Sequence, residues 1–328
     1  MTSVISVQGL KKHFRVTQKK GGVRDTIISL VKPTYRDVLA VDDVSFEIEE
    51  GEVVAFLGPN GAGKTTTLKM LSGILYPTSG EVRVLQYIPH ERKTDFQKQI
   101  SLVMGQKNQL WWDLPAIDTF LLNKDIYGIS DHTYNHSLHE LVELMEAGQI
   151  LNIPVRRLSL GQRMKCELIA SLLHRPKVLF LDEPTIGLDI VVQKKLRNFL
   201  KEYNQKHRTT IILTSHYMGD VKEICKRVIL INRGKKMYDG SIDELVQNYA
   251  KDKYVAVDFE SKITKTDLEA VRGIKILEFD GSKAVLSIPR NTHTQKCAEL
   301  LTKFPVIDLN IREVELEDVI VKFYSRKV

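Results

Sequence analysis

Residues 58–66 read Gly58-Pro59-Asn60-Gly61-Ala62-Gly63-Lys64-Thr65-Thr66. This stretch matches the phosphate-binding loop pattern G-x-x-x-x-G-K-[ST]. Its glycines allow backbone N–H groups to converge on phosphate oxygens, because no Cβ stands in the way. Lys64 supplies a charge for the β- and γ-phosphates, and the hydroxyl of Thr65 can ligate Mg²⁺. The stretch therefore predicts a site for a triphosphate and a magnesium ion.

The segments on either side of this loop support the prediction. Residues 53–57 form a β-branched and apolar run that predicts a buried strand. Residues 65–75 carry apolar side chains at helical spacing, so the loop would lie at a helix N-terminus, where the dipole favours anions. A glycine-rich turn with an accidental lysine does not account for this context. The loop alone still leaves kinases, GTPases, motors and transporters open.

The composition is that of a globular protein. The chain has 328 residues, 43% hydrophobic and 27% charged, enough for two domains or for one large domain with an appendage. No stretch approaches the ~18–20 uncharged apolar residues that span a bilayer, and the first residues lack the form of a signal peptide. The three cysteines, Cys166, Cys225 and Cys297, show no metal or redox spacing, so we expect a reducing, cytosolic compartment.

Basic residues gather near the N-terminus of a chain whose net charge is +7. Residues 11–36 contain eight of them: Lys11, Lys12, Arg15, Lys19, Lys20, Arg24, Lys32 and Arg36. Such a surface permits attraction to anionic lipid or nucleic acid, although a solvated basic surface is the simpler reading.

The order of predicted elements indicates two domains. Between residues 178 and 231, strand-like runs alternate with helical patterns, which indicates a parallel sheet covered on both faces. Further strands are predicted at 3–10, 44–48 and 81–85, and residues 106–159 are mostly helical. Beyond about residue 248, the order β-α-β-β-α-β-α predicts a small α+β sandwich of ferredoxin-like type, with Asp280-Gly281 as a hairpin signal.

Two carboxylates end the apolar run 178–183. Asp182 can hold Mg²⁺, and Glu183 can accept a proton from an attacking water. A buried strand capped by acidic loop residues is an equally good explanation of this pair alone.

Other polar residues stand at element ends. Ser159 and the N–H of Gly161 lie just before the helix that we expect at 163–173, which suits an anion site or a plain N-cap. Gln106 and His216 follow strand-like runs, and Asp189 follows the carboxylate pair. Each of these residues, taken singly, has a structural explanation.

The order and spacing of all these motifs resemble those of the ATP-binding-cassette (ABC) ATPases. The chain matches the Walker A loop, the Q-loop, the signature motif, the Walker B strand, the D-loop and the switch histidine of this family, in sequence order: residues 58–66, Gln106, Ser159 to Gln162, Asp182-Glu183, Asp189 and His216. The resemblance covers about residues 3–245. It implies an α/β nucleotide-binding domain of residues 1–247, with a P-loop RecA-like core, an antiparallel β subdomain and a helical subdomain at about 107–172. Residues 248–328 are then a C-terminal α+β accessory domain.

The resemblance also implies the role of each site residue. ATP is the substrate, Glu183 is the general base, and His216 contacts the γ-phosphate and positions the water. Thr65, Gln106 and Asp182 would serve Mg²⁺ and its waters. The residues expected around the nucleotide, some of them from a second subunit, are Gly58, Pro59, Asn60, Gly61, Ala62, Gly63, Lys64, Thr65, Thr66, Ser159, Gly161, Gln162 and Asp189. Because one chain carries one copy of each motif, two chains must meet, with two-fold symmetry if they are identical.

The sequence departs from the family pattern at two points. Leu160 stands where the signature usually has a glycine, but Ser159 and Gly161 remain, so we expect function to survive. The aromatic residue that usually stacks on adenine is best matched by Phe14, with Tyr35 as a rival, and a core phenylalanine is the alternative reading of Phe14.

Within the family, the chain most resembles ATPase subunits of the ABC-2 exporter type, in residues 58–71, 183–189 and the tail 314–321. This implies a separate membrane permease as partner, a peripheral location on the cytoplasmic face of the membrane, and no nucleic-acid partner. Trp111-Trp112 lies where a permease would dock, so at least one of the pair is a candidate surface anchor. One core tryptophan with a partly exposed neighbour explains the pair equally well. The basic insertion, about residues 17–38, would face the permease or anionic lipid headgroups, or be a solvated loop.

Two rival classes remain. One is a soluble single-cassette ABC ATPase that acts in assembly or regulation without a permease. The other is a small-molecule P-loop kinase, which would leave residues 159–162 and His216 unexplained. Co-purification with a multi-span membrane partner would separate a transporter from both.

Overall fold

The computed structural model describes residues 3–17, 35–105, 107–249 and 251–325. The chain divides into two compact units, Met1–Gly240 and Ser241–Val328. The second unit includes helix α9 (Ile242–Tyr249), most of which lies before the boundary at 247/248 that the sequence suggests.

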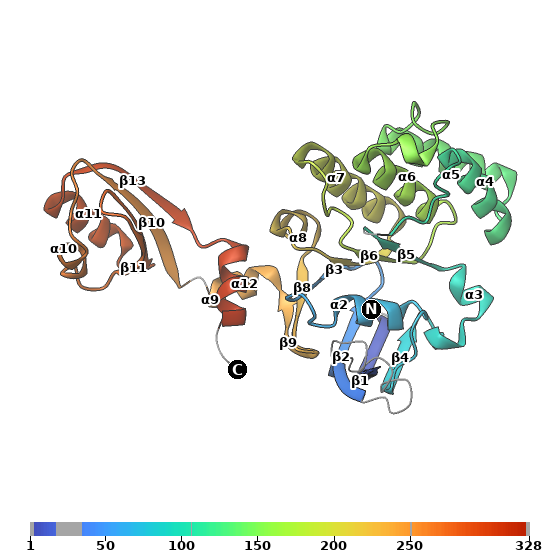
Figure 1. The fold of residues 1–328 in the computed structure, drawn as a ribbon, viewed down its shortest axis with the longest axis horizontal. Helices are drawn as coiled ribbons and strands as arrows, with labels where there is room; N and C mark the ends of the chain where they lie inside the picture. Colours follow the sequence, from blue (N-terminus) through green and yellow to red (C-terminus); the bar gives the residue numbers. More distant parts are fainter. Residues whose placement is uncertain (1–2, 18–34, 106, 250, 326–328) are drawn as a thin grey trace, which may run out of the picture. The chain divides into compact units, whose positions relative to one another are not determined.

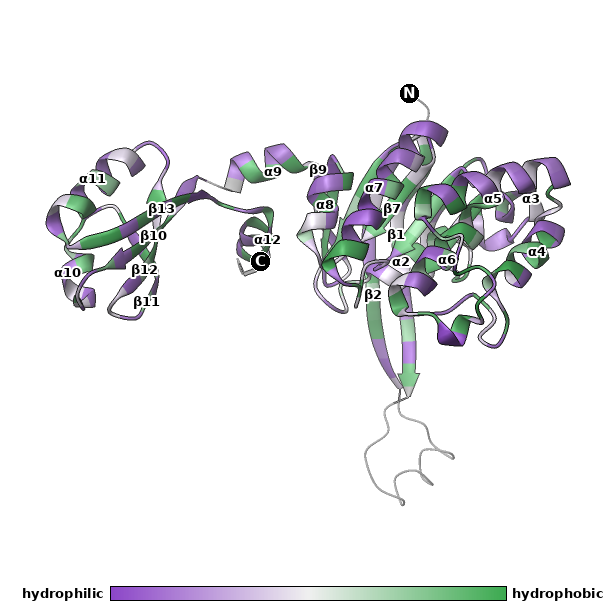
Figure 2. Ribbon diagram, turned by 90° about the horizontal axis from the view of Figure 1, so that it is seen from above, coloured by the Kyte–Doolittle hydropathy of each residue, from purple (hydrophilic) through white to green (hydrophobic). Residues whose placement is uncertain are grey.

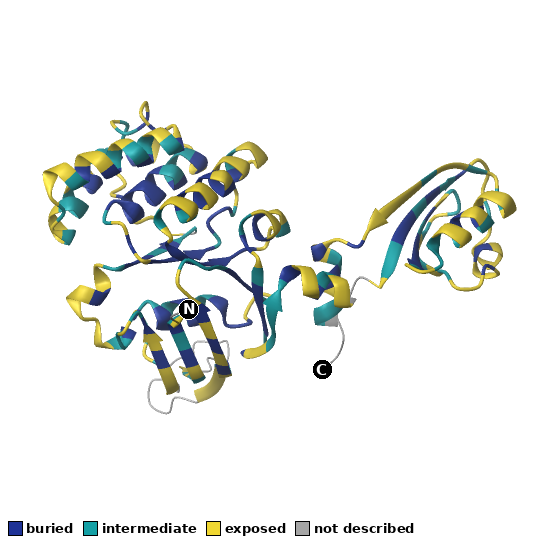
Figure 3. Cartoon of the chain, turned by 180° about the vertical axis from the view of Figure 1, so that it is seen from behind, coloured by how far each residue is buried: buried dark blue, intermediate teal, exposed yellow. Residues whose placement is uncertain are grey.

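A six-stranded sheet forms the centre of the first unit, in the order β5-β6-β7-β3-β8-β9. The pairs β5–β6, β6–β7, β7–β3 and β3–β8 are parallel, as the alternation of strands and helices predicted. The bounds of these strands are β3 Val53–Leu57, β5 Ile100–Met104, β6 Val178–Asp182, β7 Thr210–Thr214, β8 Arg227–Asn232 and β9 Lys235–Ser241. Strands β6 and β7 are buried along their whole length and are dark blue in Figure 3.

Helices cover both faces of this sheet. Helices α4 (Ala116–Tyr127), α5 (Asp131–Met145), α6 (Leu160–Leu172) and α7 (Ile190–His207) lie on one side, and α2 (Lys64–Leu71) lies on the other (Figure 1). Helices α5 and α7 carry both hydrophilic and hydrophobic stretches, as expected when one face packs and the other meets water (Figure 2). The remaining helices of this unit are α3 (Thr94–Gln97) and α8 (Met218–Ile224), with 3₁₀ turns at Pro89–Glu91 and Val155–Arg157.

An antiparallel sheet of three strands packs against α2. Its order is β2-β1-β4, with β1 at Ser3–Thr17, β2 at Tyr35–Glu49 and β4 at Ser79–Val84. One apolar core joins the two sheets and α2, and includes Ile5, Phe46, Leu68 and Phe180. The prediction that the first strand ends near residue 10 was wrong: the pairing of β1 with β2 continues to Thr17 opposite Tyr35. Because this stretch is basic, its sequence did not predict that its backbone is paired with that of β2. Residues 18–34 of the basic insertion lie outside the described residues.

The second unit has the ferredoxin-like order that the sequence predicted. Four antiparallel strands, β10 (Asp252–Phe259), β11 (Lys275–Phe279), β12 (Lys283–Pro289) and β13 (Val306–Glu313), form a sheet in the order β11-β12-β10-β13. Helices α10 (Lys265–Glu269) and α11 (His293–Lys303) complete the β-α-β-β-α-β pattern, and α12 (Leu316–Ser325) follows. The predicted hairpin at Asp280-Gly281 is confirmed: Gly281 has φ 96°, and Asp280 Oδ1 accepts the N–H of Lys283. Among the helices of the described ranges, none has the length and apolar character needed to span a membrane.

Candidate functional site

The predicted phosphate-binding loop joins the carboxyl end of β3 to the N-terminus of α2. Gly63, the residue before α2, has φ 106°, and a Cβ there would stand 2.5 Å from the carbonyl oxygen of Ala40. Only glycine fits this position without strain, because the backbone of β2 passes so close. The neighbouring strand thereby fixes the loop at the start of the helix, where free N–H groups favour anions.

Lys64 is held inside the loop. Its side chain is almost buried, and Nζ donates to the carbonyl oxygens of Gly58, at 2.7 Å, and Pro59, at 3.3 Å. Burial lowers the pKa of this lysine, whereas the nearby carboxylates of Glu183 and Asp182 raise it. The ammonium group thus lies between the loop backbone and two acidic side chains.

Asp182, at the end of β6, is bracketed by two threonine hydroxyls. Thr65 Oγ1 donates to Oδ2 at 2.7 Å, and Thr214 Oγ1 donates to Oδ1 at 2.7 Å. These groups come from α2 and β7, so three elements converge on one carboxylate. A cavity of about 140 Å³ opens beside it, lined by Thr65, Lys69, Met104, Lys107, Asp182 and Glu183. A hydroxyl and a carboxylate fit Mg²⁺, which takes oxygen ligands and completes its shell with waters and phosphate oxygens.

Glu183 adopts a backbone conformation that non-glycine residues rarely use, with φ 54°. Its N–H donates to the carbonyl oxygen of Thr214, at 3.1 Å, and to the hydroxyl of the same residue, at 3.0 Å, which holds this conformation in place. Its Oε1 lies 2.8 Å from Nε2 of His216. The structure therefore brings together Lys64, Thr65, Asp182, Glu183 and His216, which we call the phosphate-binding end.

A buried network supports this end, and nothing in the sequence pointed to it beyond an acidic residue early in a short helix. Asp220 is fully buried; its Oδ2 accepts the hydroxyls of Thr185, at 2.6 Å, and Ser215, at 2.7 Å. Arg197 donates from Nη1 to Oδ1 at 3.1 Å and from Nε to Glu223 at 2.9 Å. Because Ser215 precedes His216, the network fixes the histidine segment against α7 and the loop after Glu183.

The signature residues lie at the other end of the helical layer. Ser159 is the N-cap of α6, and Ser159 and Gln162 form a reciprocal capping box. A Cβ on Gly161 would stand 3.1 Å from the methyl groups of Val192. Asp189 caps α7 by accepting the N–H of Val192 at 2.9 Å. We call residues 159–162 and 189–192 the signature end.

No hydrogen bond between described residues joins the signature end to Lys64, Thr65, Asp182, Glu183 or His216. Two apolar side chains beside it face solvent: Ile190 is 79% exposed and Val191 is 66% exposed. Leu160 is exposed as well. The signature end is thus complete in its own hydrogen bonding and is surrounded by uncovered apolar surface.

Glu167 connects the signature helix to the segment after residue 106. Its Oε1 accepts the backbone N–H of Gln109, at 2.8 Å, and of Leu110, at 3.2 Å. The side chain is buried, and Oε2 has no hydrogen-bond partner in the described ranges. Burial raises the pKa of Glu167, against the lowering effect of the two N–H groups. In a sequence, a charged residue on a helix predicts a solvent-exposed position. The contact of Glu167 with Gln109 and Leu110 was therefore not predicted. Gln106 itself lies outside the described residues.

The two candidates for adenine stacking lie on the paired ribbon. Phe14 is half-buried on β1 opposite Val38, and Lys12 Nζ lies 5.2 Å from its ring centroid. Tyr35 is exposed opposite Thr17, with the guanidinium of Arg15 at 4.2 Å. Gly63 packs near Ala40 on β2, and at about 3.4 Å per residue Tyr35 lies about 17 Å farther along this strand. Phe14 is therefore nearer to the loop.

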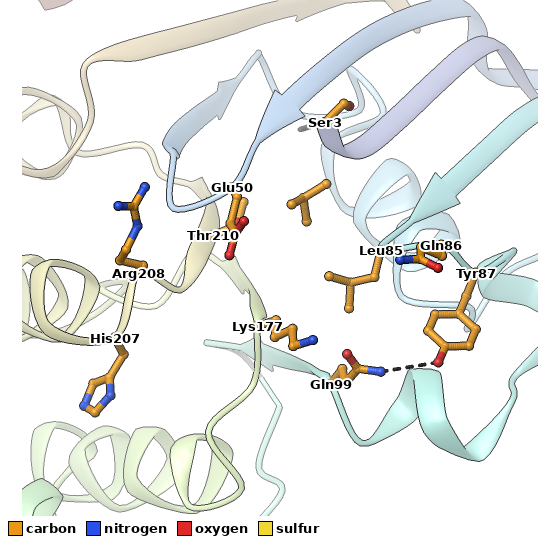
Figure 4. A pocket seen from close by; sticks show the side chains of 11 residues that line it. Ser3, Glu50, Leu85, Gln86, Tyr87, Gln99, Lys177, His207, Arg208 and Thr210 are labelled. Atoms are coloured by element: carbon orange, nitrogen blue, oxygen red, sulfur yellow. Dashed lines mark hydrogen bonds between the residues drawn. The ribbon is translucent and has the colours of Figure 1, made fainter. Parts of the chain in front are cut away.

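A second cavity, of about 640 Å³, lies at the opposite edge of the sheet (Figure 4). Its walls include Gln99, Lys177 and Thr210, which stand at the amino ends of β5, β6 and β7. Figure 4 shows Gln99 within reach of the Tyr87 hydroxyl, at 3.5 Å. Asp182 and Thr214 end the same strands at the carboxyl edge, so this cavity is separate from the phosphate-binding end.

Comparison with known proteins identifies the class. Residues 41–186 match the "ABC transporter" family model, and residues 251–312 match "EvrA-like ABC transporter, C-terminal domain". The ABC transporter ATP-binding protein NatA of Bacillus subtilis is 32% identical over 211 residues, 64% of this chain and 85% of that protein. The chain belongs to the ABC transporter family of ATP-binding proteins, which bind and hydrolyse ATP.

Two further comparisons bear on function and fold. The Nod factor export ATP-binding protein I of Burkholderia pseudomallei is 32% identical over 66% of this chain and 71% of that protein. A dimeric ATP-binding cassette solved in a post-hydrolysis state with ADP and Pi superposes with a TM-score of 0.59 at 22% identity, over 72% of this chain and 98% of that one. The latter shows the ABC ATPase fold, as the sequence predicted.

Proposed function

We propose that two copies of this chain close around two ATP molecules and drive export through a separate membrane permease of the ABC-2 type. Each composite site would combine the phosphate-binding end of one copy with the signature end of the other. The observation that carries this proposal is the signature end. Among the described residues, its donors make no hydrogen bond to the phosphate-binding end of their own chain, and its exposed Ile190 and Val191 offer an apolar surface for a second copy.

In this proposal the phosphate-binding end holds the substrate. The loop N–H groups and Lys64 would bind the β- and γ-phosphates of ATP, and Phe14 would stack on adenine. Thr65, Asp182 and Gln106 would hold Mg²⁺ and its waters, and the ion would neutralise charge on the phosphate oxygens. Thr214 keeps the Asp182 carboxylate in place by its 2.7 Å hydrogen bond.

Glu183 would accept the proton of the attacking water. Its strained backbone fixes the carboxylate, and the 2.8 Å contact with His216 places the imidazole directly beside the proposed base. Ser159 and the N–H of Gly161 from the partner subunit would add donors to the γ-phosphate as charge develops. Hydrolysis then requires closure of the two copies.

The tryptophan pair supports a permease partner. Trp111 and Trp112 are both exposed, so both side chains are accessible to another protein. The guanidinium of Arg163, on the signature helix, stacks 4.5 Å from the Trp112 ring. A partner that binds the tryptophans would thus touch the helix that carries Ser159.

Export as the direction, and a peripheral position on the cytoplasmic face of the membrane, rest on the ABC-2 style of the motifs and on the export role in the name of one relative. The basic insertion, with its possible contact to the permease or to anionic lipid, belongs to the same proposal. An ABC ATPase that acts without a permease is the alternative.

Mixing two inactive variants tests the composite site. Lys64→Ala removes the phosphate cation, and Ser159→Asp keeps a good N-cap while placing a negative charge toward the γ-phosphate. In a mixed dimer one site carries both defects and the other carries neither. We expect each variant alone to be inactive and an equal mixture to recover up to about a quarter of the wild-type ATPase rate, because half of the dimers are mixed and each has one intact site.

Ser159→Asn is the matched control, because it caps the helix without the charge and should retain most activity. A mixture that stays inactive, while each variant folds and Ser159→Asp binds ATP, would show that each chain completes its own site.

The permease is tested separately, by co-purification from membranes. Trp111→Ala/Trp112→Ala should lose the multi-span partner while the isolated subunit keeps its ATPase rate. Tyr76→Ala, an exposed aromatic on another part of the unit, serves as control. Absence of any membrane partner for the wild-type chain would favour the alternative without a permease.

A further inference from the structure

Strand β13 is the outer strand of the sheet in the second unit. One of its sides pairs with β10, and the other side has no neighbouring strand among the described residues. Its backbone N–H and C=O groups on that side are available for another strand. The strand is also unusually apolar for an outer one: Ile307 is 69% exposed, and Ile311 is exposed too. Such an edge favours addition of a further strand.

The side chains of β13 divide between two faces. Leu309 packs against the apolar core of this unit, and alternation places Ile311 on the same face. Ile307 lies at an irregularity of the β10–β13 ladder, between Val306 opposite Phe259 and Asp308 opposite Asp258, so alternation does not assign its face. Asp308 and Arg312 project from the opposite face, with Asn310 between them. One face of the edge is therefore apolar, and the other carries an acidic and a basic residue in the order Asp308-x-Asn310-x-Arg312.

This order is complementary to itself. If a second β13 runs antiparallel with its two-fold axis at Asn310, Asp308 stands opposite Arg312 of the partner subunit, and the reverse pair forms as well. On the apolar face, Leu309 then stands opposite the partner subunit's Ile311. Shifting the register by one residue would place Asp308 opposite Ile311 in one direction or opposite Glu313 in the other, so charge selects the register about Asn310.

Asp308 faces a like charge within its own sheet, so a cation beside it would be stabilising. In the β10–β13 ladder it stands directly opposite Asp258, and like charges in that position destabilise a pair. Lys283 bonds to Asp258 at 2.6 Å and reaches Asp308 only by longer-range attraction. An arginine arriving from the open side would relieve this repulsion.

Arg312 is placed to supply that arginine. It is only partly covered, its contact with Asp318 is 3.4 Å long, and its guanidinium lies 4.9 Å from the Tyr254 ring centroid. Tyr254 and Asp318 thus hold the side chain beside β13, where 48% of it stays exposed and its five N–H donors can meet a further acceptor.

We infer that β13 pairs with β13 of a second copy of this chain, antiparallel about Asn310, so that two four-stranded sheets become one of eight strands. This contact needs no nucleotide. It goes beyond the ATP-dependent closure proposed above, because it would hold two copies together between rounds of hydrolysis at a high effective concentration.

Disulfide formation in the full chain tests the register. Asn310→Cys places two identical cysteines opposite each other, with Cβ atoms about 5 Å apart, close enough to join. We expect a covalent dimer under mild oxidation without ATP, in a Lys64→Ala background that removes the nucleotide-dependent contact. Asp308→Cys is the control: its two copies would lie about 13 Å apart, and no dimer should form. Native Cys166, Cys225 and Cys297 are buried.

Charge variants test the same contact without a covalent bond. Asp308→Arg and Arg312→Asp should each weaken the dimer of the full chain by about tenfold or more, because like charges then face each other. A mixture of the two should recover the wild-type dissociation constant, since Arg meets Asp at both pairs of the mixed dimer. Sedimentation without ATP measures all three.

Three results would overturn the inference. The first is an Asn310→Cys chain that stays monomeric while folded. The second is crosslinking at residue 308 but not at 310, which would set a different register. The third is capture of a permease segment instead of a second copy by Asn310→Cys in the membrane complex. None of these results would affect the composite ATP site, which the mixed-variant ATPase measurement tests independently.

Discussion

The phosphate-binding end and the signature end use their polar groups in different ways. At the phosphate-binding end, hydrogen bonds link α2, β6 and β7 through Asp182, and the buried Asp220 joins α7 and α8 behind it. At the signature end, Ser159 and Asp189 cap only the helices that they begin. The first end is a network that one chain completes, whereas the second is a set of helix starts surrounded by exposed apolar side chains. In the proposed function, hydrolysis thus uses the end where long-range hydrogen bonds are dense, and docking of a second copy uses the end where they are sparse.

The largest effect should come from the phosphate-binding end. Glu183→Gln removes the proposed base but keeps the size of the side chain, so we expect ATP hydrolysis to fall about 10²- to 10⁴-fold while ATP binding survives. ATP should then trap the dimer, which light scattering detects. A Glu183→Gln chain with wild-type turnover would refute the assignment of the base.

The next largest expected effect is a difference in the free energy of unfolding between a variant at each end. Asp220→Ala leaves the nearly buried Arg197 without its main partner and should lower the free energy of unfolding by about 3–5 kcal/mol. Ser159→Ala removes one helix cap and should cost about 1 kcal/mol. Urea unfolding of both variants measures the difference. Equal losses would mean that the signature end is as deeply integrated as the phosphate-binding end.

A smaller effect is expected in the pH dependence of stability at Glu167, whose carboxylate links the signature helix to Gln109 and Leu110. Because its pKa is raised above 4.5, the stability from this group is fully present below that value and is lost as the pH rises through the raised pKa. Glu167→Gln lacks this component. As the pH rises above 4.5, the free energy of unfolding of this variant should therefore increase relative to that of the wild type.

Glu299→Gln is the opposite control for that measurement. Hydrogen bonds from Lys296 and Lys303 lower the pKa of Glu299 to about 2, so its contribution is present above 4.5 and is lost as the pH falls through the lowered value. This variant should therefore be less stable than the wild type above pH 4.5, and the difference should shrink as the pH falls toward about 2. A Glu167→Gln chain whose stability tracks the wild type at every pH would mean that burial does not govern this carboxyl.

How much the sequence predicted depends on the range of the interactions. The strands Val53–Leu57 and Thr210–Thr214 lie within apolar runs of the sequence, because a strand buried on both faces is recognisable from its own continuous apolar residues. The ferredoxin-like order followed from alternation and from a hairpin turn at Gly281 that requires positive φ. Family resemblance named the residues that meet at the phosphate-binding end.

Residues whose role rests on distant partners escaped prediction. Asp220 and Glu167 read as ordinary helix charges, and only folding shows that each is buried against another segment. Thr214 read as an apolar strand's last residue, yet it positions both Asp182 and Glu183. The length of β1 was missed for the same reason, since its basic second half is paired with β2 rather than shaped by its own pattern.

The smallest effect should come from Leu160, the point where the signature departs from its family. Leu160 begins α6, is exposed, and approaches Gly187, where a Cβ would stand 3.0 Å from its Cδ2. Leu160→Gly should cost about 1 kcal/mol of helix stability and change the ATPase rate by no more than about threefold, because the N-cap and the Gly161 amide remain. Its neighbour provides the contrast: Ser159→Asp changes a donor that is proposed to face the partner's phosphate and should abolish activity. Steady-state ATPase assays on the two variants compare adjacent positions on one helix turn. If Leu160→Gly is as inactive as Ser159→Asp, the leucine itself contacts the partner, and the signature end recognises its nucleotide by more than its polar donors.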